Sequence, residues 1–357
     1  MTYFSFRAEF EDGRSIDVVP TYVHPLGVAE IRALAENEMA ALVMKVESYD
    51  VAVDGERQDG LSKLKMNVTF HQPATIYALV HGGWLPLPFV MPPRFLVDRN
   101  VVISLRKLRE GKTVANGYAL QWWANFFAQG SGMFNPLPYA FEAGYQRKPT
   151  MAEFASAYDE GASELLEALP NCHIVKFAKA NYTAAYTQLE ALDSRNECEI
   201  KFLQAVCPIV ANRVSRRREV EVANTIVRLA DSLKVNRASF TVMTALSCLY
   251  EDLHGSPPSI GRQILKPKLV YAEADAFNAL NDLRHIELAT AGQVYFKNEA
   301  FSLCTCDRAL ALLWCALSPR GEALSERSVE FTFDLTSDLF SRLNEVELFT
   351  LKQMLHA

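Results

Sequence analysis

Four acidic residues stand in the sequence where their side chains could bind a metal ion: Asp98, Glu142, Asp282 and Asp307. Asp98 follows the apolar run 95–97 and Asp307 follows residues 301–306, so we expect each where a strand ends and a helix begins. In open α/β sheets, ligands bind at that edge. Glu142 and Asp282 are expected on helices, from which they could reach the same edge.

Carboxylates gathered within a few ångströms of one another repel, which raises the pKa of each. A divalent cation removes this repulsion, and Mg²⁺ or Mn²⁺ prefers carboxylate and water oxygens. The four acids together therefore predict a Mg²⁺ or Mn²⁺ site. Taken singly, each has an ordinary explanation. Asp98 and Asp307 could cap helices, and Glu142 and Asp282 could be solvated acids on helix faces.

Two short motifs surround the aspartates that follow the predicted strands. Residues 95–102 read Phe-Leu-Val-Asp-Arg-Asn-Val-Val, and residues 303–310 read Leu-Cys-Thr-Cys-Asp-Arg-Ala-Leu. These segments resemble the opening and closing motifs of the PIN-domain nucleases, and Glu142 and Asp282 resemble that family's helical acids. The stretch from Glu142 to Asp282 is much too long for a PIN core, which indicates a helical insertion at about 146–267.

The resemblance implies an α/β fold with a PIN-like parallel-sheet core. It also implies a metal-dependent endoribonuclease that hydrolyses phosphodiester bonds and leaves a 5′-phosphate and a 3′-hydroxyl. Asp98 and Asp307 would be the principal metal ligands. Asp282 would bind the metal directly or through water, and Glu142 would be a ligand or a base that orients water.

Polar residues beside the acids extend the site that the resemblance implies. Asn100 and Thr305 would hold the metal-binding carboxylates in position. Arg99 and Arg308, each next to an expected metal ligand, would contact the phosphate of the substrate.

A dense basic stretch at 213–218 is a further candidate for phosphate contact. Arg213 and Arg217 lie four residues apart, so a helix would place them on one face. The alternative is an ordinary solvated face whose arginines pair with Glu219 and Glu221, and we favour it slightly.

Other titratable residues lie near the four acids in the sequence. Glu153 and Glu160 are alternatives to the first helical acid, and Asp275 and Glu287 could supplement the second. His285, one turn after the second helical acid, could contact phosphate or metal. The default expectation for it is a structural histidine with satisfied hydrogen bonds.

The elements that must position these residues follow from the hydrophobic pattern. Residues 1–90 look β-rich, with a hairpin turn at Asp12–Gly13 and a single helix at 28–46. The regular elements predicted elsewhere are strands at 66–70, 74–80, 95–97, 300–304 and 328–335, and helices at 101–109, 150–168, 184–192, 195–214, 217–233, 238–253, 272–290, 308–317 and 337–355. These elements predict a small β-rich domain at 1–90, a PIN-like domain at 91–320 and a strand-helix extension at 321–357.

The composition limits the classes of function. The chain has 357 residues and a formal charge of −6, which excludes a uniformly basic nucleic-acid coat but not a local basic groove. We expect a soluble, cytoplasmic protein, because there is no membrane-length apolar stretch and no signal peptide, and the seven cysteines lack disulfide spacing.

The expected partner is RNA, with DNA as the other candidate substrate. Nucleases of the family often serve as toxins or defence effectors, so an inhibitory protein or a second copy of the chain is a further expected partner. The contrasting hypothesis is a non-catalytic interaction protein on the same fold, in which the acids are helix caps and surface charges.

Overall fold

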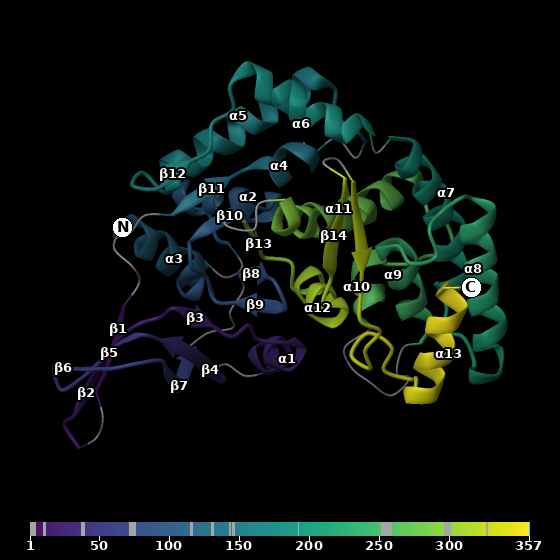
Figure 1. Ribbon diagram of the computed structural model, residues 1–357. Helices are drawn as coiled ribbons and strands as arrows, with labels where there is room; N and C mark the ends of the chain where they lie inside the picture. The colour runs from purple at the N-terminus through teal and green to yellow at the C-terminus, as the bar shows by residue number, and fades with distance from the viewer. Residues whose placement is uncertain are drawn as a thin grey trace.

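The computed structural model describes residues 5–9, 12–36, 40–70, 76–114, 117–129, 132–142, 144, 147–191, 193–250, 259–295, 301–325 and 328–356. Figure 1 shows small antiparallel sheets near the N-terminus, a central mixed sheet, and a large helical region that ends at α13 (Glu345–His356). The protein is therefore a mixed α/β fold. None of the described helices is long and apolar enough to cross a membrane.

The predicted hairpin at the start of the chain is confirmed. Strands β1 (Phe6–Glu9) and β2 (Ser15–Val19) pair antiparallel. Gly13 in the turn has a φ of 84°, which glycine adopts without steric cost. Strands β5 (Asp50–Val53) and β6 (Glu56–Gln58) extend this sheet in the order β1-β2-β5-β6.

The single helix predicted at 28–46 is wrong in its second half. Helix α1 covers Val28–Glu36, and Ala40–Ser48 forms strand β4, which pairs with β7 (Ser62–Phe70) and with β3 (Tyr22–Val23). Within β4, Leu42 and Met44 are buried whereas Val43 is exposed. This two-residue alternation is the pattern of a half-buried strand, and the apolar richness of the segment concealed it.

The central sheet has six strands in the order β12-β11-β10-β13-β8-β9. The first four pair in parallel and the last two join antiparallel. Their bounds are β12 His173–Ile174, β11 Met133–Asn135, β10 Arg94–Val97, β13 Ser302–Thr305, β8 Tyr77–Val80 and β9 Gly83–Leu85. The sheet thus takes two strands from before residue 90, and the predicted domain boundaries stay a prediction.

Helices cover this sheet and lead away from its strands. They are α2 (Arg99–Arg109), α3 (Gly117–Gln129), α4 (Leu137–Glu142), α5 (Met151–Ala168) and α12 (Arg308–Leu317). The capping box at Thr150 is confirmed, since Thr150 and Glu153 exchange hydrogen bonds with each other's backbone N–H. Helix α3 and strand β11 were not predicted. The rings of Trp123 and Phe127 on α3 are buried against Phe95 and Phe134 of the sheet.

A helical region separates β12 from β13, as the sequence predicts. It comprises α6 (Lys179–Ala191), α7 (Asp193–Val210), α8 (Glu219–Ser232), α9 (Phe240–Leu249), α10 (Ile260–Leu265) and α11 (Glu273–Tyr295). Helix α11 returns to the central sheet, where it packs against α4, α12 and β13. The C-terminal segment adds the hairpin β14 (Arg320–Ser325) and β15 (Ser328–Thr332), and its helix begins at Glu345 rather than at the predicted 337.

Candidate functional site

Asp98 stands at the carboxyl end of β10 and caps α2. Its Oδ1 accepts a hydrogen bond from the backbone N–H of Arg99 at 2.6 Å, and its Oδ2 accepts one from the Thr305 hydroxyl at 2.5 Å. The side chain is buried. The ordinary explanation as a helix cap is therefore correct for Asp98, yet the bond to Thr305 also fixes the carboxylate across to the neighbouring strand β13.

Asp307 occupies the equivalent place after β13. Its Oδ1 accepts hydrogen bonds from the backbone N–H groups of Ala309 (2.7 Å) and Leu310 (3.0 Å), so it caps α12. Its own N–H donates to the Thr305 hydroxyl at 2.9 Å. No described residue donates a hydrogen bond to Oδ2, so this oxygen can accept a further ligand.

The predicted supporting residues connect these two aspartates. Asn100 accepts a hydrogen bond from the N–H of Cys306 at 3.0 Å, and its side-chain amide lies 3.5 Å from the Thr305 hydroxyl. That hydroxyl donates to Asp98 and accepts from Asp307. Asn100 and Thr305 thus tie the start of α2 to the start of α12, so the two strand ends keep a fixed spacing.

Glu142, the last residue of α4, reaches the same place. Its Oε2 lies 3.8 Å from Nε of Arg99, and no described residue donates a hydrogen bond to the carboxylate. Burial raises the pKa of Glu142. The negative charges of Asp98 and Asp307 add to the rise, whereas Arg99 and a protonated His285 oppose it. The carboxylate is therefore poorly stabilised by the protein around it.

Asp282 on α11 completes the set of acids. Its pKa is raised well above the usual value, first by burial and then by the negative charges of Asp307, Asp98 and Glu142. No described residue donates a hydrogen bond to it. The four acids thus come from four separate parts of the chain, and their charges act on one another near the carboxyl ends of β10 and β13.

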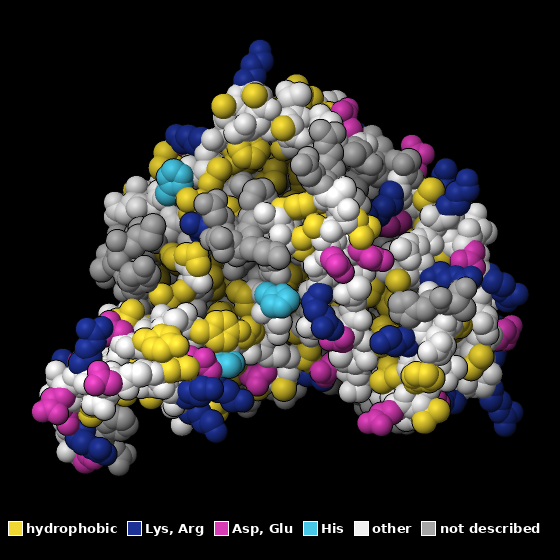
Figure 2. Space-filling model, viewed as in Figure 1, with side chains coloured by type: hydrophobic (Ala, Val, Ile, Leu, Met, Phe, Trp, Pro, Cys, Tyr) yellow, Lys and Arg dark blue, Asp and Glu magenta, His cyan; other side chains and the backbone are white. Residues whose placement is uncertain are grey.

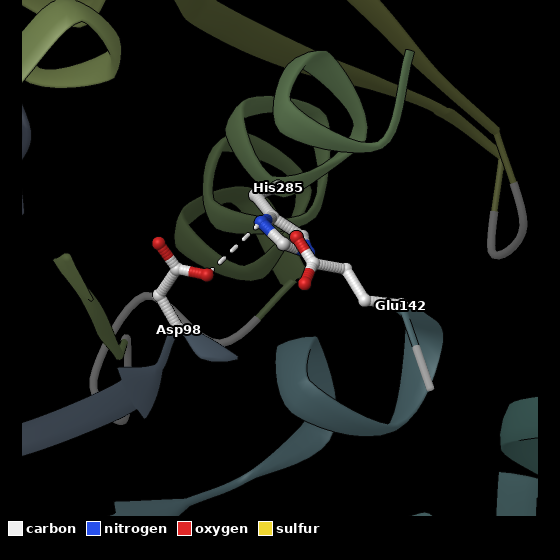
Figure 3. Close-up of side chains that lie close together, drawn as sticks. All are labelled: Asp98, Glu142 and His285. Carbon is white, nitrogen blue, oxygen red and sulfur yellow. Dashed lines mark ion pairs between the residues drawn. The ribbon is translucent and has the colours of Figure 1, made fainter. Parts of the chain in front are cut away.

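His285, treated as structural in the sequence, proves to be part of this cluster. It is 1% exposed, and neither ring nitrogen has a hydrogen-bond partner among the described residues. Its Nδ1 lies 3.6 Å from Oδ1 of Asp98, and Figure 3 shows the ring between the carboxylates of Asp98 and Glu142. Its spacing of three residues from Asp282, which places both on one face of a helix, indicates a possible contact with metal or phosphate. The described residues leave its hydrogen bonds unsatisfied, so the default expectation of satisfied hydrogen bonds is wrong.

The tightest grouping in the cluster is Asp98, Glu142 and His285, whose ligand atoms all lie within 4.8 Å of one another. No three-ligand group containing Asp282 or Asp307 is as close among the described residues. A divalent cation fits this donor set, because carboxylate oxygens and an imidazole nitrogen are metal ligands and several of them lack hydrogen-bond donors. A cation would also offset the repulsion that raises the pKa of Asp282 and Glu142.

The alternative acids are used elsewhere. Glu153 caps α5 and pairs with Arg147, which lowers the pKa of Glu153 to about 2. Glu160 pairs with Arg106 at 2.9 Å, and Asp275 pairs with Lys268 at 2.8 Å. Of the three acids considered for the first helical acid of the site, Glu142 is the one that lies in the cluster. Asp275 pairs with Lys268 and does not contribute to the cluster.

The remaining alternative, Glu287, belongs to a second buried cluster on α11. Arg284 bonds Glu199 at 2.8 Å and Glu287 at 2.5 Å. Arg195 pairs with both glutamates, and the Thr241 hydroxyl donates to Glu199. This Arg–Glu network joins α7, α9 and α11, so it fixes the position of the helix that carries Asp282 and His285.

The predicted substrate-binding arginines fall into two groups. Arg99 lies beside Glu142 and over the Tyr139 ring, with 6.0 Å between the guanidinium carbon and the ring centroid, and the charge of Arg308 acts on Tyr77. Arg99 therefore flanks the cluster, whereas Arg308 is placed near it only by following Asp307 in the chain.

The basic stretch 213–218 lies between α7 and α8, against the C-terminal segment, so the single helix face predicted for Arg213 and Arg217 is wrong. Arg216 pairs with Glu219 and Glu347, and Arg218 lies 3.4 Å from Glu221. Arg213 and Arg217 are exposed there. The stretch matches the alternative of a solvated face with paired charges. On the side shown in Figure 2, basic and acidic side chains are interspersed over the N-terminal and helical regions.

A cavity of about 280 Å³ lies at the opposite edge of the central sheet. Pro92, just before β10, and Ser302, the first residue of β13, are among its lining residues. Its lining includes no Asp, Glu, Lys or Arg. The polar chemistry is therefore concentrated at the carboxyl edge and not in this cavity.

Comparison with known proteins leaves the site to be interpreted from its own residues. The chain matches no protein-family model, no curated protein and no solved structure. Because a fold hosts many activities, the function must be inferred from the chemistry of the site. What the geometry establishes is a group of Asp98, Glu142 and His285 at the carboxyl edge of a mixed α/β sheet. Asp98 and His285 are buried and Glu142 is half-buried, and the charges of Asp282 and Asp307 act on this group.

Proposed function

We propose that this protein is a metal-dependent endonuclease with a PIN-like core, and that it hydrolyses phosphodiester bonds in RNA. The observation that carries the proposal is the meeting of Asp98, Glu142, Asp282 and Asp307, of which Glu142 and Asp282 receive no hydrogen bond from the described residues. Such a cluster is unfavourable without a cation, so its retention in a buried site points to a bound ion.

The position of the cluster in the sheet supports a ligand-binding role. From β10 the chain passes to β11 and β12 on one side, and it later returns to β13 on the other side. The strand order therefore reverses between β10 and β13. Open α/β sheets bind their ligands outside the carboxyl ends of the strands at such a point.

The residues can be given roles in the hydrolysis. Asp98 and Glu142 would hold the ion, with Asp282 and the free oxygen of Asp307 as further ligands directly or through water. A divalent ion held by these residues would polarise the phosphate and lower the pKa of a bound water. Thr305 holds the Asp98 carboxylate at a fixed angle, and Arg99 is placed to contact a phosphate oxygen.

The non-catalytic alternative has one observation in its favour. Arg99 lies 3.8 Å from Glu142, and His285, if protonated, would carry a positive charge 3.6 Å from Asp98. These two side chains could serve as internal counter-ions in place of a metal. The cluster would then be a structural element, and the helical region would offer a partner surface.

A cleavage assay separates the two functions. Labelled single-stranded RNA, and DNA as a second substrate, would be incubated with the protein and Mn²⁺ or Mg²⁺, and the 5′-phosphate ends counted. We expect cutting by the wild type, a loss of at least about 100-fold in Asp98→Asn, and wild-type activity in Glu160→Gln, an acid paired outside the cluster. Equal cutting by Asp98→Asn, or no cutting by any form, would overturn the proposal.

A further inference from the structure

We propose that His285 binds the metal ion directly and makes the site select a first-row transition ion, Mn²⁺ in the first instance, over Mg²⁺. This inference rests on the metal site of the proposed function but not on the cleavage reaction. It adds a nitrogen ligand to a site whose other candidate ligands are all carboxylates.

The burial of His285 is the first observation behind the inference. A neutral imidazole has one N–H donor and one lone-pair acceptor, and both normally find partners inside a protein. The His285 ring is 1% exposed, so bulk water does not reach it, and both nitrogens lack partners among the described residues. A group that accepts the lone pair of the imidazole, such as a metal ion, would therefore stabilise the ring in this position.

The position of the ring is the second observation. The ring lies between Asp98 and Glu142 (Figure 3), and its ligand atom is within 4.8 Å of theirs. The Nδ1–Oδ1 separation of 3.6 Å is too long for a hydrogen bond. It is close to the separation of two ligands on one ion, since each ligand lies about 2 Å from a first-row metal.

The rigidity of α11 is the third observation. Arg284, the preceding residue, is held by Glu199 and Glu287 at 2.8 and 2.5 Å. The part of α11 that carries His285 therefore cannot move away from the carboxylates without breaking a buried network. The position of His285 is therefore preorganised for binding the ion.

The chemistry of the ligands decides the kind of ion. Mg²⁺ takes oxygen ligands almost exclusively and keeps several waters, whereas imidazole suits first-row transition ions. Mn²⁺ accepts carboxylates and imidazole together. Its unpaired electrons give an electron paramagnetic resonance signal that reports which atoms bind it. A site of carboxylates alone would show little preference between Mn²⁺ and Mg²⁺.

Pulsed electron paramagnetic resonance on the full chain with one equivalent of Mn²⁺ tests the inference. We expect the spin-echo modulation of a directly bound ¹⁴N in the wild type and its loss in His285→Gln. In the same variant the Kd for Mn²⁺, from a titration of free Mn²⁺, should rise at least about tenfold. The Kd for Mg²⁺, from competition, should change by less than about threefold. His173→Gln, which removes an exposed histidine on β12, should match the wild type.

The outcomes distinguish this inference from the proposed function. Bound Mn²⁺ without ¹⁴N modulation would overturn the histidine ligand and leave the carboxylate site intact. Bound Mn²⁺ with ¹⁴N modulation but no RNA cutting would uphold the ligand and overturn the nuclease. No Mn²⁺ binding at all would overturn both. If His285→Gln fails to fold, a wild-type spectrum without ¹⁴N modulation still overturns the inference.

Discussion

Helix α11 carries two buried charged clusters that differ in one respect. In the Arg–Glu network, two arginines face two glutamates, and each of these groups contacts an opposite charge. Thr241 and Asn196 add hydrogen bonds to it. In the acidic cluster, four carboxylates meet His285 and Arg99, and Glu142, Asp282 and His285 have no hydrogen bond from the described residues. One cluster is complete within the chain, and the other is not.

The difference indicates what each cluster is for. A buried charge network that satisfies itself fixes the arrangement of helices, and its removal costs stability. A buried network that leaves like charges unpaired costs stability as it stands, and it persists where a ligand or a reaction needs it. The two clusters lie within one helical turn of each other, so the first holds the second in place.

The largest expected effect is the loss of stability on breaking the Arg–Glu network. Arg284→Met leaves Glu199 and Glu287 buried with Arg195 as their remaining cation, and we expect the free energy of unfolding to fall by about 3–5 kcal/mol. Urea denaturation measures it. The control Arg218→Met breaks an exposed pair with Glu221 and should cost less than about 0.5 kcal/mol. Equal losses in the two variants would mean that the network does not hold α11.

The next effect is the stabilisation of the folded chain by an ion that binds the acidic cluster. Mn²⁺ at about 100 times its Kd should stabilise the folded chain by about 2.7 kcal/mol, because it binds the folded state alone. The melting temperature with Mn²⁺ and with a chelator measures this difference. Asp282→Asn and Asp98→Asn should reduce the shift, while Asp275→Asn, an acid on the same helix that pairs with Lys268, should keep it. A shift that survives in Asp98→Asn would place the ion elsewhere.

A smaller effect is the pH dependence of the metal-free protein. The folded-state pKa values of Asp282 and Glu142 lie above their unfolded values, so the folded state holds these protons more tightly. Their contribution to stability is present below about pH 4, the unfolded pKa, and is lost as the pH rises through the raised pKa values. Denaturation at several pH values measures the slope.

The matched variant for this slope is Asp282→Asn, which removes one of the two titrating groups. In the absence of metal it should be more stable than the wild type at pH 7, because it lacks a carboxylate whose pKa is raised by burial and by the neighbouring negative charges. Its stability should also fall less with rising pH. A less stable Asp282→Asn would contradict the view that this carboxylate is repelled by its neighbours.

The smallest effect is expected at Asp307. This residue caps α12, and its charge also acts on the acidic cluster. Asp307→Ala removes the cap and should cost about 1 kcal/mol in the metal-free protein. Asp307→Asn keeps a capping oxygen and should cost less, while it still weakens Mn²⁺ binding. If both variants bind Mn²⁺ like the wild type, Asp307 is a cap alone.

The sequence by itself determined the local structure around the site. The switch from strand to helix at Asp98 and at Asp307, the capping box at Thr150 and the hairpin at Gly13 all follow from short-range backbone chemistry. The error at 28–46 has the opposite cause, since the buried face of β4 exists only because β7 and β3 pair with it.

Tertiary structure alone decided which charged residues share a site. Glu142, Glu153 and Glu160 look alike in the sequence, and only the path of α4 selects the first. His285 and Glu287 lie half a turn apart on α11, yet one faces acids and the other arginines. The environment of a side chain depends on residues far away along the chain, because burial and neighbouring charges act through space, and no local pattern records them.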